Sequence, residues 1–158
     1  MIEEPQIVPV SGLITFDSLN ELRQYIRELL SYYEKQFDLY SQKVGSLMRL
    51  YEKKEKGMET RRFKDDNWEK IGMLMVNKRD SLLGTLEIML EAMEEYKIKL
   101  TRTTEVLTSF DELEQLNAPD GASVTLYLRN GVPMRIIFDN LKSGGVDTAW
   151  LTALRISS

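Results

Sequence analysis

Apolar residues recur at helical spacing over two long stretches of this chain, and this pattern constrains the fold more than any other feature. In the first stretch they fall at a mean interval of about 3.6 residues, the repeat of an α-helix, so they stay on one face. The spacing predicts a single helix over residues 18–56, with Ser18 and Glu21 in the capping-box pattern at its start. The apolar face consists of Leu22, Ile26, Leu29, Tyr33, Phe37, Tyr40, Val44, Leu47 and Tyr51.

The second stretch alternates its apolar residues by four and three, which is the heptad spacing of a coiled coil. Asp66 or Asn67 is the predicted cap of this helix, which places Gly72 inside it. Ser109 and Glu112 form a second capping pair, so we expect the helix to break there and to restart as a short one. The heptad positions are Leu82, Leu86, Met89, Met93, Tyr96, Leu100, Thr103, Leu107 and Phe110.

Five methionines and one arginine lie within the two predicted helices. Methionine adapts to irregular gaps, so we favour core packing for all five, and an adaptable partner-binding seam is the alternative. Arg79 falls at an a position of the heptad, where a charge needs a partner. We expect an ion pair with a carboxylate of the first helix, and a contact that specifies an oligomer is the alternative. The methionines are Met48, Met73, Met75, Met89 and Met93.

Two long helices joined by a short segment predict an antiparallel, coiled-coil-like helical hairpin. A hairpin of this length leaves much of its apolar stripe uncovered when it stands alone. We therefore expect a homo-oligomer, with a dimer favoured, or a protein partner that closes a four-helix arrangement. The expected interface residues are Leu82, Leu86, Met89, Met93, Tyr96, Leu100 and Leu107.

The chain changes period after residue 118. Alternation in Val124–Arg129, the turn signal Asn130-Gly131 and a returning apolar face in Met134, Ile136 and Phe138 predict an antiparallel β-hairpin. Pro133 belongs on an edge strand or at a bulge. Residues 146–156 suit a third strand or a short helix, and the segments "QIVPV" and "LITF" could add a strand or a cover.

The sequence thus predicts an α+β protein in three segments: an extended segment over 1–17, a helical hairpin over 18–117 and a small C-terminal β-hairpin or meander over 118–158. Three strands with one apolar face need something to lie on. We expect that the β segment packs on the helices of its own subunit or of a neighbouring subunit, as an attachment or capping piece.

Residue types exclude much chemistry. With no cysteine and no histidine, disulfides, cysteine nucleophiles, histidine bases and His-containing metal motifs cannot form. No phosphate-binding loop or nucleophile motif occurs, so we expect no enzyme, catalytic residue, metal or cofactor. The net charge is −4, and no apolar run approaches the ~18 residues that span a bilayer. The acidic N-terminus lacks a signal-peptide pattern. We expect a cytoplasmic protein that does not act at a membrane.

A short basic segment keeps nucleic acid open as a partner. Arg61, Arg62, Phe63 and Lys64 place three cations around an aromatic ring, which suits phosphate contact with base stacking. Glu59, Asp65 and Asp66 offset those charges, so we favour a solvated turn.

Two resemblances bear on the same alternative. "VPMRIIFDNLKSGGVDTAWLTALRI", residues 132–156, resembles the last strands of ring-shaped DNA sliding clamps, although the two-domain clamp repeat and the terminal Ala-Pro are absent. The order of a helical domain and then a small β module is similar to that of GINS replication-complex subunits. We expect a non-enzymatic assembly or adaptor subunit that acts through its helical seam. The alternative is a nucleic-acid-associated subunit of a replication, repair or defence complex, which is what the resemblances imply.

Overall fold

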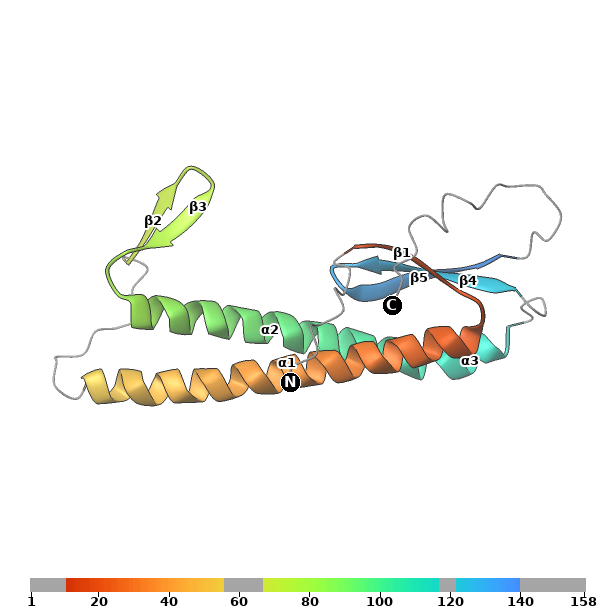
Figure 1. Ribbon diagram of the computed structural model, residues 1–158, viewed down its shortest axis with the longest axis horizontal. Coiled ribbons are helices and arrows are strands. Elements are labelled where there is room, and N and C mark those ends of the chain that lie inside the picture. The colour runs from red at the N-terminus through yellow and green to blue at the C-terminus, as the bar shows by residue number, and fades with distance from the viewer. Residues whose placement is uncertain (1–10, 56–66, 117–121, 140–158) are drawn as a thin grey trace. The chain divides into compact units, whose positions relative to one another are not determined.

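The computed structural model describes residues 11–55, 67–116 and 122–139 (Figure 1). The predicted α+β class is confirmed: two long helices pack antiparallel, and small antiparallel sheets accompany them. The elements in chain order are β1 (Gly12–Phe16), α1 (Leu19–Glu55), β2 (Trp68–Ile71), β3 (Leu74–Asn77), α2 (Ser81–Thr108), α3 (Phe110–Glu114), β4 (Ser123–Arg129) and β5 (Val132–Asp139).

The first helix begins at the predicted capping box. The Ser18 hydroxyl oxygen accepts a hydrogen bond from the backbone N–H of Glu21 at 3.2 Å. In return, the Glu21 carboxylate accepts one from the backbone N–H of Asp17 at 3.0 Å. The first bond satisfies one of the backbone donors that a helix start leaves free, and the second holds the residue before the cap. The single helix predicted over 18–56 is confirmed as the 37 residues of α1.

The chain forms two compact units, and the boundary between them cuts both long helices. We call Met1–Tyr33 together with Ile98–Ser158 the sheet unit, and Glu34–Lys97 the helical unit. The predicted division into residues 1–17, 18–117 and 118–158 follows chain order instead, and it stays a prediction.

In the sheet unit, β4 lies between β1 and β5 in an antiparallel sheet. The strand suggested by "LITF" is confirmed as β1, which pairs with β4. Asn130 (φ 52°) and Gly131 (φ 74°) form the predicted two-residue turn, with the two positive φ values of a type I′ turn. Pro133 lies on the edge strand β5, beside a bulge, as predicted.

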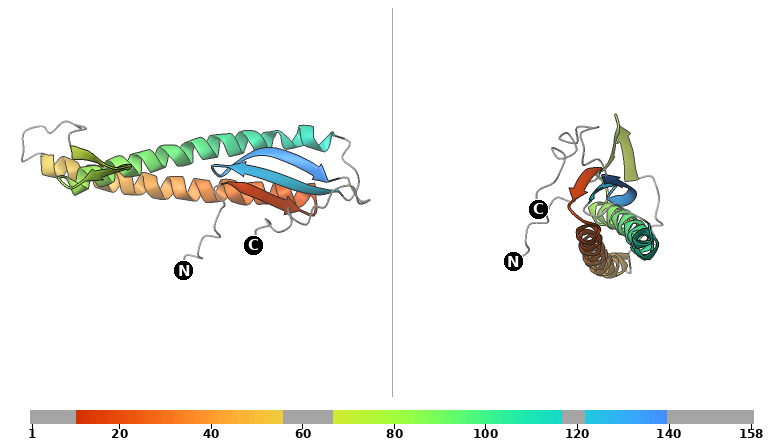
Figure 2. Two further views of the ribbon diagram at one scale, coloured as in Figure 1. Left: turned by 90° about the horizontal axis from the view of Figure 1, so that it is seen from above. Right: turned by 90° about the vertical axis from the view of Figure 1, so that its right-hand side faces the viewer.

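One face of this sheet covers the helices of its own unit, which is one of the two predicted placements. Figure 2 shows β1, β4 and β5 lying across the N-terminal part of α1 and the C-terminal part of α2. Met134 does not belong to the predicted apolar face: it is the extra residue of the bulge, so its side chain is exposed. The buried apolar side chains of this unit are Ile14, Leu22, Ile26, Leu29, Tyr33, Phe110, Val124, Leu126, Leu128 and Val132.

Residues 67–80 depart from the predicted helix. They form the hairpin β2–β3, in which Gly72 has a φ of 63° at the first position of a two-residue turn, as in type II′ turns. The second helix instead starts at Ser81, where the Asp80 carboxylate caps it by accepting the backbone N–H of Leu83 at 3.1 Å. The predicted cap at Asp66 or Asn67 and the helical Gly72 are therefore wrong.

The predicted restart after the second helix is confirmed by α3, which begins at Phe110. Its predicted cap is wrong, because the Ser109 hydroxyl donates to the Glu105 carbonyl at 3.1 Å and makes no capping bond.

Residues 146–156 lie outside the described part of the chain, so strand and short helix stay open there. Within the described ranges, no helix is both long and apolar enough to cross a membrane.

Candidate interaction surface

The predicted interface residues mostly serve packing inside the chain. Leu86 is completely buried, and the other six are partly buried. The Tyr96 ring, for example, lies 5.4 Å from the Tyr40 ring of α1, measured between centroids. These residues also divide between the units: Leu100 and Leu107 lie in the sheet unit, and the rest in the helical unit. Of the seven, only Met89 lines the groove described below.

The other predicted contacts fall into two groups. Arg61, Arg62, Phe63 and Lys64 lie outside the described residues. Arg79 lies in the bend before α2 and not at a heptad position, because β2–β3 replaces the first turns of the predicted helix. It is exposed, and it forms no ion pair within the described ranges.

Three methionines do not fill the core, which corrects the preferred interpretation. Met73 at the tip of the β2–β3 turn is 99% exposed, and Met75 on β3 is 58% exposed. Met48 on α1 is exposed as well, whereas Met89 and Met93 on α2 are partly buried. Met73 lies in the turn between the two strands, and Met75 lies on a two-stranded sheet, which has no second layer to cover its side chains.

The hairpin β2–β3 is held on α2 by its first and last residues. The indole N–H of Trp68 donates to the Glu87 carboxylate at 2.5 Å. Asn77 accepts the backbone N–H of Asp80 at 3.1 Å, and its side chain lies so close to Gly84 that a Cβ there would be 2.7 Å from the amide nitrogen. The absence of a side chain at Gly84 therefore permits the close approach of Asn77.

The turn end of this hairpin exposes apolar side chains. Ile71, Met73, Leu74 and Met75 all expose more than half of their surface, and they surround the turn. We call these four residues the hairpin patch. Ile71 and Leu74 are register partners on one face of the hairpin, Met75 lies on the other face, and Met73 lies in the turn. Several exposed apolar side chains on one short element are typical of an interaction site, because a single exposed apolar side chain needs no explanation but a cluster does.

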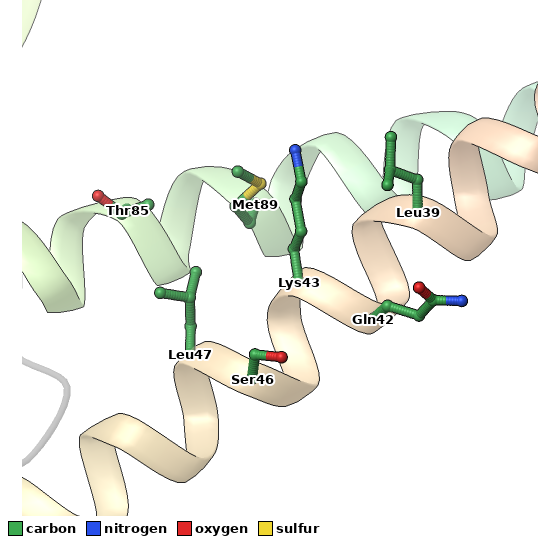
Figure 3. A pocket seen from close by; sticks show the side chains of 7 residues that line it. All are labelled: Leu39, Gln42, Lys43, Ser46, Leu47, Thr85 and Met89. Atoms are coloured by element: carbon green, nitrogen blue, oxygen red, sulfur yellow. The ribbon is translucent and has the colours of Figure 1, made fainter. Parts of the chain in front are cut away.

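A groove lies between α1 and α2 within the helical unit (Figure 3). It has a volume of about 460 Å³. Figure 3 shows Leu47 of α1 and Met89 of α2 on facing walls. The seven lining residues are Leu39, Gln42, Lys43, Ser46, Leu47, Thr85 and Met89.

A second stripe on α1 contributes three of its residues, Leu39, Lys43 and Ser46, to the lining of this groove. Leu39, Lys43, Ser46 and Leu50 follow one another by four, three and four residues, so they share a flank beside the core stripe. Leu39 and Leu50 are exposed. Sequence reasoning missed this stripe, although its spacing was visible, because the stronger core stripe of the same helix already accounted for the helical pattern.

The described residues contain no acidic cluster of three or more groups placed to hold a metal ion.

Burial, and to a lesser extent the charge of Glu28, raises the pKa of Tyr25 to about 12. A phenol with this pKa stays protonated at neutral pH, so it cannot serve as a base. Its hydroxyl has no hydrogen-bond partner in the described part of the chain.

Comparisons of this chain with protein-family models, with curated proteins and with solved structures gave no match.

Proposed function

We propose that this protein is a non-enzymatic assembly or adaptor subunit, which oligomerises or binds a partner protein through its helical hairpin. The observation that carries the proposal is the distribution of exposed apolar side chains. Eight of the twelve large ones among the described residues lie in the helical unit, although that unit is the smaller one. They are Leu39, Met48, Leu50, Ile71, Met73, Leu74, Met75 and Ile88.

Exposure on this scale is costly for a chain that works alone. Each Å² of apolar surface left in water forgoes about 25 cal/mol, so covering a side chain such as Leu74, which is 69% exposed, is worth on the order of 1 kcal/mol. A partner that covers the hairpin patch and the groove gains this free energy, less the entropy lost on association. This gain supports a contact role for both surfaces.

The proposed contact surface differs in part from the heptad seam. Leu86 is taken by packing within the chain, so it is not offered to a partner. Met89 belongs both to the seam and to the groove, and the hairpin patch adds residues that the seam does not contain. We also propose a cytoplasmic location, as the sequence predicts.

Paired affinity purifications from the native source test this function. The wild type is compared with Leu74→Glu/Met75→Glu, which places two charges on the hairpin patch, and with the control Glu91→Lys, which changes an exposed charge on α2. We expect one defined set of proteins, or a second copy of the chain, to be lost from the double variant and kept by the control. Identical recoveries with all three proteins, and a strict monomer in sedimentation equilibrium, would contradict the proposal.

The alternative function, a nucleic-acid-associated subunit of a replication, repair or defence complex, rests on the sequence alone. Its candidate residues Arg61–Lys64 lie outside the described part of the chain. A salt-dependent shift of labelled DNA or RNA that disappears in Arg61→Ala/Arg62→Ala would favour it, because phosphate contacts weaken steeply with salt.

A further inference from the structure

We propose that the groove between α1 and α2 in the helical unit binds an acidic amphipathic helix of a partner protein. This inference rests on the proposed function and adds the chemistry of the partner. Three features of the groove carry it: an apolar floor, a length that matches the repeat of a helix, and an excess of positive charge along its α1 side.

The floor fits the apolar face of a helix. Leu39, Leu47 and Met89 supply the apolar side chains, and Met89 brings the flexible thioether that lets a surface adapt to its ligand. Leu39 and Leu47 are eight residues apart on α1, so the groove extends about 12 Å along that helix at roughly 1.5 Å per residue. Two helical turns of a ligand, with anchors at i, i+3 or i+4 and i+7, match this length.

The charged residues that line or border the groove lie on its α1 side. Lys43 lines the groove, and no carboxylate does. Residues three or four positions from the lining residues of α1 are their neighbours on the helix surface, and the charged ones among them are Lys35, Asp38 and Arg49. The Arg49 guanidinium donates to the hydroxyl of the lining residue Ser46 at 3.3 Å, which places it at the rim.

The α2 side adds no opposing charge. The residues three or four positions from Thr85 and Met89 are all uncharged. Three cations and one carboxylate therefore border the groove. In the described part of the chain, Lys35, Lys43 and Arg49 form no ion pair, so their charges are available to an acidic partner.

The same features argue against two other occupants. No aromatic side chain lines the groove, so it lacks the stacking platforms that single-stranded nucleic acid uses. A second copy of the chain is a poor fit to the groove. On the described outer face of α2 that carries Glu91 and Glu95, the large exposed apolar side chains are Ile88 and Ile98, which are ten residues apart. Two anchors with carboxylates between them do not supply the i, i+3 or i+4, i+7 repeat that the groove matches. An acidic helix with several leucines does.

Fluorescence anisotropy with designed peptides tests this inference on the full chain. The probe is a labelled helical peptide of about four turns, with leucine at i, i+3, i+4 and i+7 and with glutamate and alanine elsewhere. The first control peptide has the same composition in scrambled order. The second keeps the leucines and replaces each glutamate by lysine.

The protein variants are matched in charge. Lys43→Glu/Arg49→Glu reverses two exposed charges at the groove, and Arg27→Glu/Arg102→Glu reverses two exposed charges in the sheet unit. We expect the wild type to bind the acidic peptide more tightly than either control peptide. Reversal at the groove should weaken this binding about ten-fold and favour the lysine peptide, because attraction becomes repulsion at two rim sites. The sheet-unit variant should bind as the wild type does.

Three results would overturn the inference. Equal binding of the three peptides would mean nonspecific apolar contact. Absence of peptide binding, together with a dimer in sedimentation equilibrium that Leu39→Glu dissociates, would make a second copy the occupant and leave the proposed function standing. Binding of labelled DNA that is lost in Lys43→Glu/Arg49→Glu would make the groove a phosphate site. Identical recoveries in the paired purifications, together with a strict monomer, would instead contradict the proposed function itself.

Discussion

At the scale of single residues, one hydroxyl connects a helix to the turn that the sequence predicts most clearly. The Tyr33 hydroxyl donates to the carbonyl oxygen of Gly131 at 2.5 Å, and the Tyr33 side chain is buried. The ring also lies 5.8 Å from the Lys99 ammonium. The turn residues Asn130 and Gly131 were predictable from their types, but the tyrosine that meets them, about a hundred positions away, was not.

Tyr33→Phe should therefore lower the free energy of unfolding by about 1–3 kcal/mol, because it leaves the Gly131 carbonyl without this donor in a buried place. Urea unfolding followed by circular dichroism measures the loss. Tyr32→Phe is the matched control, since Tyr32 is only partly buried, and it should change the stability by less than about 0.5 kcal/mol. Equal losses for the two variants would show that this hydrogen bond does not matter.

Tyr25 gives a prediction for alkaline pH. Its folded-state pKa of about 12 lies above the ordinary 10, so the folded state keeps the proton between these values while the unfolded state loses it. Stability should be fully present below pH 10 and should fall as pH rises from 10 to 12. The loss is on the order of 1–2 kcal/mol, after allowance for solvent screening of a partly exposed group.

Tyr25→Phe is the control for that measurement. It should remove this part of the alkaline decline, and at neutral pH it should be neutral or stabilising, because the hydroxyl has no hydrogen-bond partner among the described residues. Urea unfolding at pH 8 and pH 11 compares the two proteins. Parallel declines would show that Tyr25 is not the titrating group.

At the scale of elements, the sequence predicts α1, the break before α3 and the hairpin β4–β5, and it misses β2–β3. Local signals explain both outcomes. A capping box, a steady helical period and an Asn-Gly turn each act within a few residues. The missed hairpin also had a local signal, the possible turn Gly72-Met73 ahead of the apolar run Leu74–Val76, but the heptad register was extended backwards through it.

The positions of the elements also decide how much of the candidate surface could be predicted from the sequence. The heptad seam identified Met89, which lines the groove, but the remaining lining residues required knowledge of where α2 begins and which flank of α1 it leaves open. The hairpin patch could not be predicted once residues 67–80 were assigned to a helix. Long-range packing, and not residue type, decides which apolar side chains stay exposed.

The attachment of β2–β3 can be tested as an element. Trp68→Phe removes the indole donor to Glu87 while it keeps an aromatic ring. We expect hydrogen exchange of the backbone amides in 68–77 to quicken, while those in the middle of α2 keep their protection, because a two-stranded sheet is barely stable alone. A uniform change of exchange over both elements would contradict a local attachment.

At the scale of the whole molecule, the two units differ in what they leave exposed. The sheet unit covers one face of its sheet with helices, whereas the helical unit carries the hairpin patch and the groove. The chain therefore combines a unit with a well-covered sheet and a unit rich in uncovered apolar surface. The central claim is that the uncovered surface is a contact surface for protein.

Hydroxyl-radical footprinting tests this claim most directly, since it needs no knowledge of the partner. The chain is oxidised in extract of its native source and, separately, after purification at low concentration, and methionine oxidation is read by mass spectrometry. Met73 and Met75 report on the hairpin patch, and the exposed Met134 of the sheet unit is the internal control. We predict that Met73 and Met75 are protected several-fold in the extract while Met134 is oxidised equally in both. Equal oxidation of Met73 and Met75 in the two samples would contradict the claim.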